Sequence, residues 1–422
     1  MGERVYLKSL GCKVNQVEIR DIATELLSAG IDLTDSLDDA TLVVVNTCSV
    51  TVRSDAKVRK EIRRALHAPQ VAQVIATGCS AVIQGDELRR IDERVTVEPE
   101  KDHVVRTIIE GLDDVSHPSE KKKARLHTSG LHLPGNLART RANLKISDGC
   151  ENYCSYCIVP YARGGVRAVP REELAKKARA LVDSGVNEIV LSGINIGIYH
   201  DDGLDLTGLI RYLATESGIH RLRLSSIEPN SINEALLTLL EETELVCEHL
   251  HIPLQSGSDK VITDMNRHYS REQYCALIER LRSIDPCMAI HTDVIVGYPT
   301  ETDSDFDETL ELAEELEFAA MHLFKFSARP GTVAADLTPL APLIIEERFK
   351  RLQDIAKLNA QRYREMRLSS ERPLELLIER VANGKITATS REHVSIMWEE
   401  SECPFPNLDV GDIVVTLGRE CT

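Results

Sequence analysis

Strand-like and helix-like segments alternate along most of this chain, and this alternation constrains the fold more than any other feature. In the first 110 residues, apolar segments such as RVYLKSL and TLVVVN are each followed by a segment with helical periodicity. Successive strand–helix–strand units build a parallel sheet with helices on both faces. The pattern therefore predicts an α/β chain that opens with a doubly wound, Rossmann-like domain over residues 1–112.

The alternation resumes after a polar segment, 113–141, for which we predict a linker. Within residues 142–343, six β-type segments are separated by helical ones, which predicts a partial (β/α)6 barrel with its chemistry at the carboxyl ends of the strands. Residues 344–372 have helical periodicity and predict a helical connector that stops near a proline. Short alternating strands over 373–422 predict a small antiparallel β-barrel.

Composition narrows the class of protein further. Apolar residues make up 42% of the chain but aromatic residues only 4%, which favours an α/β fold over an aromatic-rich β-sandwich. The chain has no apolar run long enough to span a membrane, and its first residues lack the apolar core of a signal peptide. We therefore expect a soluble, cytoplasmic protein.

The net charge of −17 argues against a surface that is basic throughout. It does not exclude a local basic track for nucleic acid. Basic residues outnumber acidic ones in two helical segments, Arg53–Arg64 and Arg348–Arg367, whereas the segment from Glu365 onward has 6 basic and 11 acidic residues. We expect the terminal segment to bind phosphates poorly and the two basic segments to be the candidates for RNA contact.

Three of the eleven cysteines form a C-x3-C-x2-C triplet, Cys150, Cys154 and Cys157, directly after the first predicted barrel strand. An odd number of cysteines in a chain expected to be cytoplasmic indicates metal binding rather than a disulfide framework. Three thiolates can hold three irons of a 4Fe–4S cluster and leave the fourth iron open for a ligand. A three-ligand zinc site and unliganded cysteines are the alternatives, although no His or Cys follows within ten residues to complete a zinc site.

A second set of cysteines, Cys12, Cys48 and Cys79, is dispersed in sequence, but each residue closes a predicted parallel strand. The carboxyl ends of such strands meet at one sheet edge, where doubly wound folds bind ligands, so a second cluster is expected there. The alternative is that small buried cysteines fill the strand ends. The remaining cysteines fit no known spacing and are predicted to be structural: Cys247, Cys275, Cys287, Cys403 and Cys421.

The strings SLGCKVNQVE, VVNTCSVT and ATGCSA, followed by the triplet and a terminal TRAM-like barrel, resemble the radical S-adenosylmethionine (SAM) methylthiotransferase family over essentially the whole chain. Within that family, the segment 13–16 after Cys12 most resembles the branch that acts on N6-threonylcarbamoyladenosine (t6A) beside the tRNA anticodon. The alternatives are the branches that act on isopentenyladenosine or on a ribosomal protein. From another class, the alternative is a non-catalytic, metal-stabilised RNA-binding protein.

The resemblance implies two 4Fe–4S clusters, two SAM molecules and six catalytic cysteines. One SAM would methylate sulfur on the auxiliary cluster of Cys12, Cys48 and Cys79. The other, on the cluster of the triplet, would yield the radical that abstracts hydrogen from the adenine ring. The resemblance also implies a tRNA substrate, an electron donor such as a flavodoxin or ferredoxin, a sulfur donor and no membrane partner.

Residues at the barrel strand ends match positions that the family uses for SAM. Because glycine and serine are also ordinary turn residues, a packing role is the alternative for each of them. One position departs from the family pattern: Thr300 stands where many members have glycine, which predicts a shifted loop. The candidate SAM-contacting residues are Tyr156, Ser192, Gly193, Asn195, Ser225, Gln255 and Gly297.

Overall fold

The computed structural model describes residues 3–113 and 140–421. The chain divides into two compact units, each of which is described by itself. Unit 1 contains residues 1–138 together with 157–165, and unit 2 contains residues 139–156 together with 166–422. The predicted linker lies mostly outside the described residues.

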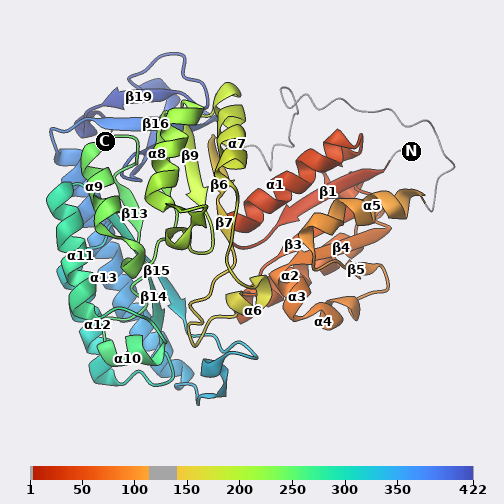
Figure 1. Cartoon of the computed structure of the whole chain (residues 1–422), viewed down its shortest axis with the longest axis horizontal. Coiled ribbons are helices and arrows are strands. Elements are labelled where there is room, and N and C mark those ends of the chain that lie inside the picture. Colours follow the sequence, from red (N-terminus) through yellow and green to blue (C-terminus); the bar gives the residue numbers. More distant parts are fainter. Residues whose placement is uncertain (1–2, 114–139, 422) are drawn as a thin grey trace. The chain divides into compact units, whose positions relative to one another are not determined.

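Unit 1 is built on a five-stranded parallel sheet with the order β2-β1-β3-β4-β5 (Figure 1). This order confirms the predicted doubly wound fold, and the chain changes direction across the sheet between β1 and β3. The strands are β1 (Arg4–Ser9), β2 (Asp32–Thr34), β3 (Leu42–Thr47), β4 (Gln73–Gly78) and β5 (Val95–Val97).

Helices cover both faces of this sheet because alternate strand residues are apolar on each side. One apolar cluster joins the sheet to α1 (Lys13–Ser28) and α5 (Val104–Asp113). A second cluster on the other face joins it to α2 (Val52–Leu66), α3 (Cys79–Ile83) and α4 (Gly85–Arg89). The short α6 (Val159–Arg163) also belongs to unit 1 and contacts α3.

Unit 2 contains six parallel strands that follow one another in chain order, as predicted for a partial barrel. Two three-stranded sheets, β6-β9-β12 and β13-β14-β15, are joined by parallel bridges from Leu222 to Val246 and from Ser226 to His251. The strands are β6 (Arg141–Lys145), β9 (Glu188–Ser192), β12 (Arg221–Leu224), β13 (His249–His251), β14 (Ala289–Val296) and β15 (Ala320–Lys325).

The helices of the barrel pack on its outer face in one large apolar core. They are α7 (Arg171–Asp183), α8 (Leu206–Ser217), α9 (Glu234–Glu242), α10 (Asp259–Asp264), α11 (Arg271–Ile284) and α12 (Asp303–Leu316). The loops contain two pairs of short antiparallel strands: β7 (Ser147–Asp148) with β8 (Arg167–Ala168), and β10 (His200–Asp201) with β11 (Leu204–Asp205). No helix in the described part of the chain is both long and apolar enough to cross a membrane.

The long helix α13 (Pro342–Ser369) leads to a four-stranded antiparallel sheet, which confirms the predicted antiparallel character of the C-terminal region. The order is β18-β17-β16-β19, with β18 and β19 at the two edges. A small core that includes Leu376, Ile386 and Trp398 holds it together. The strands are β16 (Leu374–Ala382), β17 (Lys385–Ser390), β18 (Ser395–Glu399) and β19 (Ile413–Thr416).

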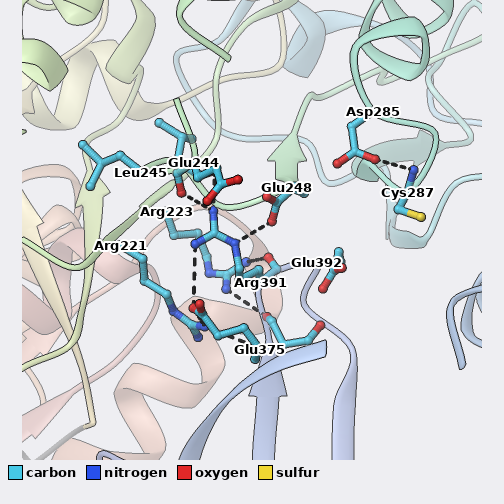
Figure 2. Close-up of polar contacts among 12 residues, drawn as sticks. Arg221, Arg223, Glu244, Leu245, Glu248, Asp285, Cys287, Glu375, Arg391 and Glu392 are labelled. Carbon is cyan, nitrogen blue, oxygen red and sulfur yellow. Dashed lines mark hydrogen bonds and ion pairs between the residues drawn. The ribbon is translucent and has the colours of Figure 1, made fainter. Parts of the chain in front are cut away.

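Two buried arginines of the barrel hold this sheet by hydrogen bonds (Figure 2). Arg221 and Arg223 alternate along β12 with leucines of the core, and both contact Glu188 of β9. Their guanidinium groups also donate to main-chain oxygens of the C-terminal sheet, at 3.1 Å from Arg223 to Ser390 and 2.7 Å from Arg223 to Arg391. Burial would raise the pKa of Glu188, but the arginines outweigh this and lower it to about 2.

Candidate functional site

The structure brings Cys12, Cys48 and Cys79 to one edge of the sheet of unit 1. Cys12 precedes the first residue of α1, Cys48 follows β3, and Cys79 is the first residue of α3 after β4. Strands β1, β3 and β4 are adjacent and parallel, so their carboxyl ends lie together. Burial raises the pKa of Cys79, and the charges of Cys12 and Cys48 raise it further. The three thiols are therefore close enough to interact.

Two glycines make room for this arrangement. Gly11 has φ +98°, and a side chain there would begin 2.5 Å from the Cβ of Cys48 and 2.7 Å from its Sγ. Gly78 has φ +87°, and a side chain there would begin 2.3 Å from Asn46 Oδ1. Both positions require the left-handed region, which glycine adopts without strain. A larger residue at Gly11 would displace Cys48 directly.

Asn15 holds the strand ends in place. Its Nδ2 donates to the main-chain oxygens of Leu10 and Thr47, each at 2.8 Å, so one amide joins the carboxyl ends of β1 and β3. Its Oδ1 accepts from Cys12 Sγ at 3.4 Å. Asn15 is 1% exposed, and an amide bonded on both sides fixes the position of its neighbours. Asn15 therefore fixes the position of Cys12 relative to Cys48.

Two cations lie beside the thiols. Burial raises the pKa of Cys79, and the charges of Arg163 and Lys101 oppose this rise. Both cations pair with Glu18, at 2.8 Å from Arg163 and 2.6 Å from Lys101, and Arg163 also donates to Asn15 at 2.6 Å. Sequence reasoning missed these partners, although Arg163 stands in PYARGG directly after the triplet and Glu18 stands in the quoted string SLGCKVNQVE.

The donor set of unit 1 fits an iron–sulfur cluster. Three cysteine sulfurs meet at one sheet edge, which matches the soft thiolate ligands that such clusters need. Arg163 and Lys101 offset the negative charge that three thiolates would bring to a site in which Cys48 and Cys79 are buried and Cys12 is exposed. Glycine at position 11 leaves space directly beside Cys48.

The triplet lies on the loop that follows β7. Cys150 and Cys154 belong to unit 2, and Cys157 begins the segment 157–165 of unit 1. Asn266 Nδ2 holds the loop by donating to the main-chain oxygens of Asn152 at 3.3 Å and Tyr153 at 3.0 Å. Burial raises the pKa of Cys150, and the charge of Cys154 raises it further. The second effect shows that these two thiols are near each other.

Arg267 is a further residue of this site that sequence reasoning did not single out. Its Nη1 donates to Cys154 Sγ at 3.6 Å, and its Nη2 lies 2.5 Å from Glu228. Its guanidinium also stacks over the ring of Tyr269, with 5.2 Å to the centroid. The guanidinium thus places a positive charge beside the sulfur of a candidate cluster ligand. The signal was present in the string MNRHY, but no spacing rule links it to the triplet.

Two of the predicted SAM-contacting residues have buried polar atoms without a hydrogen-bond partner in the described part of the chain: Asn195 Nδ2 and Ser225 Oγ. Ser225 directly follows β12, and Asn195 lies three residues beyond β9, so both stand at the carboxyl ends of adjacent barrel strands. A buried polar atom left unpaired costs about 1–3 kcal/mol. These two atoms therefore suit hydrogen bonds to a bound polar ligand such as SAM.

The other predicted SAM contacts have packing partners in the structure. A side chain at Gly193 would begin 2.6 Å from Ser147 Oγ, and one at Gly297 would begin 2.6 Å from Ile345. Buried Ser192 ends β9 and bonds to the main-chain oxygen of Val190 at 3.2 Å. These contacts explain the residue types by packing, and contact with SAM stays a prediction for all three.

Gln255 and Tyr156 complete the predicted set. Gln255 has φ +63°, and its main chain bonds to Asp293 and Ile295 of β14, at 2.8 and 2.9 Å. Tyr156 packs against a small apolar cluster that contains Met265 and Tyr298. Their contact with SAM also stays a prediction.

The turn at Thr300 accommodates its departure from the family pattern. Thr300 is absent from the described residues with positive φ, so no glycine is required at this position. Its hydroxyl donates to Asp264 Oδ2 at 2.5 Å, and its main-chain oxygen accepts from Lys260 at 2.7 Å. A side chain that bonds locally in this way fixes the turn rather than opening it.

Comparisons with known proteins identify the family of this chain. Residues 144–313 match the family model for the radical SAM superfamily, and residues 4–98 match that for uncharacterized protein family UPF0004. The chain is 37% identical over 381 residues to a threonylcarbamoyladenosine tRNA methylthiotransferase, MtaB, of Thermotoga maritima, with 87% of this chain and 85% of the relative covered. The chain belongs to the radical SAM methylthiotransferase family.

Other members of the family have a different substrate in their names. A tRNA-2-methylthio-N(6)-dimethylallyladenosine synthase of Novosphingobium aromaticivorans is 35% identical over 389 residues, covering 89% of this chain and 86% of the relative. Among solved structures, the radical SAM methyltransferase TsrM from Kitasatospora setae matches with a TM-score of 0.58 at 15% identity, over 79% of this chain and 77% of that one. That likeness supports the fold alone. Family membership makes the protein a transferase that uses SAM and a 4Fe–4S cluster.

Proposed function

We propose that this enzyme converts t6A next to the tRNA anticodon to its 2-methylthio derivative, using two SAM molecules and two 4Fe–4S clusters. The observation that carries the proposal is that Cys12, Cys48 and Cys79 meet at one sheet edge, in a chain that also has the triplet Cys150, Cys154 and Cys157. The choice of t6A is supported by the segment 13–16 and by relatives named for t6A at 37% and 36% identity. Relatives named for dimethylallyladenosine, at 35%, keep that substrate as the second candidate.

The residues around the two sites have distinct roles in this proposal. Cys150, Cys154 and Cys157 would hold the cluster that supplies the electron for SAM cleavage, and Cys12, Cys48 and Cys79 would hold the cluster that carries the donated sulfur. Arg267 places a fixed positive charge beside the sulfur of Cys154, while Asn195 and Ser225 bind polar groups of SAM. A radical route suits the reaction because an aromatic C–H is too weakly acidic for a side-chain base. The target base lies in a loop, from which it can be turned out without opening a duplex.

The segment 157–165 carries residues of both candidate sites. Cys157 belongs to the same compact unit as Cys12, Cys48 and Cys79. Only six residues further on, Arg163 bonds to Asn15 and Glu18 next to the auxiliary thiols. Six residues span at most about 20 Å even when fully extended, and part of this segment is helical. This segment of unit 1 therefore carries a candidate ligand of the first cluster, Cys157, and a residue beside the auxiliary thiols, Arg163.

Helix α2 offers the surface that we propose for tRNA. Arg53, Lys57, Lys60 and Arg64 are exposed and recur at helical spacing, so they share one face. Among the described residues, Arg53, Lys57 and Lys60 have no acidic partner within 4.0 Å, and Arg64 lies 3.7 Å from Glu61. The helix begins four residues after Cys48. Unpaired cations on one helix face suit the phosphate backbone of RNA.

The structure counts against Arg348–Arg367 as a second RNA surface, contrary to expectation from the sequence. Within α13, Arg348 pairs with Glu301 at 2.5 Å and with Asp303 at 2.6 Å, and Arg367 is buried against Glu392. Other cations of the helix pair with acidic residues on the surface. They include Arg351 with Asp307, Lys357 with Asp354 and Arg362 with Glu317. Charges already paired within the protein contribute less to phosphate binding.

Cations of the C-terminal sheet are also paired with carboxylates of the protein, which supports the expectation that the sheet binds phosphates poorly. Arg391 pairs with Glu248 of the barrel at 2.8 Å (Figure 2). Arg372 pairs with Asp285 of the barrel at 2.6 Å. Lys385 pairs with Glu399 at 3.1 Å.

The test is nucleoside mass spectrometry of tRNA from a strain that lacks this gene, with and without the gene restored. We expect 2-methylthio-t6A to disappear and t6A to accumulate, and restoration of the gene to reverse both. A Cys48→Ala copy of the gene is the matched control, because it should be expressed but should not restore the product. Loss of the methylthio derivative of isopentenyladenosine instead would assign the second substrate. A modified ribosomal protein, or no change in any nucleoside, would overturn the proposal.

We also propose that this enzyme is cytoplasmic. It receives electrons from a flavodoxin or ferredoxin and sulfur from a separate donor. Reconstitution of the reaction with reduced flavodoxin or ferredoxin in place of a chemical reductant tests the first of these partners. Product formation that depends on the added electron carrier is the expected result.

A further inference from the structure

Three histidines from distant parts of unit 2 meet where the C-terminal sheet contacts the barrel. His249 is the first residue of β13, His291 lies in β14, and His393 lies in the loop between β17 and β18. His249 and His291 belong to adjacent parallel strands, in which His251 is paired with His291. Their strand neighbours Leu250 and Ile290 point to the apolar core under the helices. The histidines therefore lie on the opposite, inner face of the barrel sheet.

The three imidazole rings converge. Ligand nitrogens of the three side chains all lie within 4.8 Å of one another. The ring centroids are 4.3 Å apart for His249 and His291, 4.8 Å for His249 and His393, and 5.1 Å for His291 and His393. His249 and His291 are 3% and 8% exposed. Three nitrogen donors thus converge in a largely buried space.

The loop that carries His393 is built tightly. His393 has φ +66°, in the left-handed region, and its main-chain N–H donates to Ser390 O at 3.0 Å. Ser390 Oγ accepts from the main-chain N–H of Val394 at 3.1 Å. The neighbouring oxygens of Ser390 and Arg391 accept from Arg223 of the barrel. A left-handed non-glycine residue persists where its surroundings over-determine it, and here they fix the third ring against the other two.

We propose that His249, His291 and His393 form a binding site for a divalent transition-metal ion, zinc in the first instance, that joins the C-terminal sheet to the barrel. Imidazole nitrogen is a preferred zinc ligand, whereas calcium and magnesium prefer oxygen. Three histidines leave a fourth position for water. Zn–N bonds of about 2.0–2.1 Å in a tetrahedron place the nitrogens about 3.3 Å apart, so the rings must rotate inward from their present spacing.

A neighbouring group of similar composition is a weaker candidate. His251, Asp293 and His322 also lie within reach of one another. Here, however, the Asp293 carboxylate is already 3.1 Å from His251 Nε2 and 3.6 Å from His322 Nδ1, so contact with this carboxylate accounts for the arrangement without metal. The side chain of His322 is 56% exposed. This group therefore serves as an internal comparison rather than as a second site.

The experiment measures zinc in the full chain after both iron–sulfur clusters have been reconstituted and excess metal has been removed. Occupied clusters keep zinc away from the six cysteines. We expect about one zinc per chain. The zinc X-ray absorption spectrum should contain a nitrogen or oxygen shell at about 2.0–2.1 Å and no sulfur shell at about 2.3 Å. Added zinc should raise the melting temperature, because a ligand that binds only the folded state stabilises it.

Substitutions separate the proposed site from other sources of zinc. His393→Gln, in a loop, should weaken zinc binding at least tenfold and abolish the melting shift, and His249→Gln should do the same. His200→Gln, at an exposed hairpin, and His322→Gln, in the comparison group, should retain wild-type zinc. Removal of His393 leaves the barrel strands intact, so a folding failure of the His249 variant would not prevent the test.

Three outcomes would overturn the proposal: a wild-type chain that retains no zinc and shows no melting shift, a spectrum with a sulfur shell, or a His393→Gln variant that binds zinc as tightly as the wild type. In each case the three imidazoles pack against one another without a metal ion. None of these outcomes bears on the methylthiotransferase proposal, which depends on the cysteine sites.

Discussion

The auxiliary site of unit 1 collects Cys12, Cys48 and Cys79 from the ends of three parallel strands, whereas the triplet occupies eight consecutive residues of one loop. The first set exists only when the sheet has formed, because 36 and 31 residues separate its members in sequence. The members of the second set are near each other even in the unfolded chain. Spacing therefore reveals a local ligand set, and only strand order reveals a dispersed one.

The two units also use their cations differently. On α2 of unit 1, Arg53, Lys57 and Lys60 are exposed and, among the described residues, have no acidic partner. In unit 2, the arginines of β12 are buried against Glu188, and those of α13 are largely paired. A count of basic residues along the sequence does not separate these cases. The charge available to RNA depends on the pairs that the fold makes.

The largest expected effect follows removal of the triplet. A Cys150→Ala, Cys154→Ala, Cys157→Ala variant should lose about half of its iron, from about eight to about four per chain, and all SAM cleavage. The auxiliary site should keep its iron because none of its three cysteines is changed. Iron and sulfide analysis of anaerobically reconstituted protein measures this. Full iron content in the variant would mean that the triplet holds no cluster.

Removal of one auxiliary ligand should abolish sulfur transfer without abolishing SAM cleavage. A Cys48→Ala variant should still cleave SAM to 5′-deoxyadenosine under reducing conditions but should transfer no sulfur to tRNA, because the two steps use different irons. Cys275→Ser, a half-buried cysteine of α11 outside both sites, is the matched control and should do both. Chromatography of the nucleoside products separates the two steps. If the Cys48 variant with an intact triplet cluster no longer cleaves SAM, the sites are not separable in this way.

Much of this arrangement was predictable from local patterns, and the remainder depends on partners that are distant in sequence. The alternation of segments predicted the parallel sheet and the barrel, but strands β2 and β5 have three residues each, too few to show a period. The six cysteines were predictable from spacing and strand ends. Asn15, Arg163 and Arg267 were not, because their importance comes from the groups that they meet across the fold.

The basic helices provide a prediction of intermediate size. Removal of four charges from α2 should weaken tRNA binding and lower the slope of log affinity against log salt by up to about 3, since each phosphate contact contributes about 0.7–0.9. Glutamine keeps the helix propensity close to that of the basic residues. The α2 variant replaces Arg53, Lys57, Lys60 and Arg64 with glutamine.

The matched control removes four charges from α13 and should change the slope much less, because most of those cations are paired within the protein. Fluorescence titration of tRNA at several salt concentrations measures both variants. If the α13 variant lowers the slope as much as the α2 variant does, the cations of α13 also contact RNA. The control replaces Arg351, Lys357, Arg362 and Arg364 with glutamine.

The smallest expected effect concerns acid and the buried pairs of unit 2. The pKa of Glu188 is about 2 in the folded protein, because the arginines outweigh the effect of burial. A carboxylate whose pKa is lowered on folding stabilises the protein above its unfolded value, near 4.5, and this contribution is lost as the pH falls toward 2. At 1.36 kcal/mol per pKa unit, the contribution is about 3 kcal/mol.

Glu188→Gln removes this titration while keeping the shape of the side chain. The difference in unfolding free energy between wild type and Glu188→Gln should be greatest above pH 5 and should shrink as the pH falls below about 4.5. Trp398, the single tryptophan, is buried in the C-terminal sheet that Arg221 and Arg223 hold, so its fluorescence reports urea unfolding of this region. A Glu375→Gln variant, which changes a partly exposed partner of Arg221, should show a smaller difference. A wild-type advantage that stays constant down to pH 3 would show that the arginines do not depend on an ionised Glu188, and the contrast between paired and available cations would then lose its strongest example.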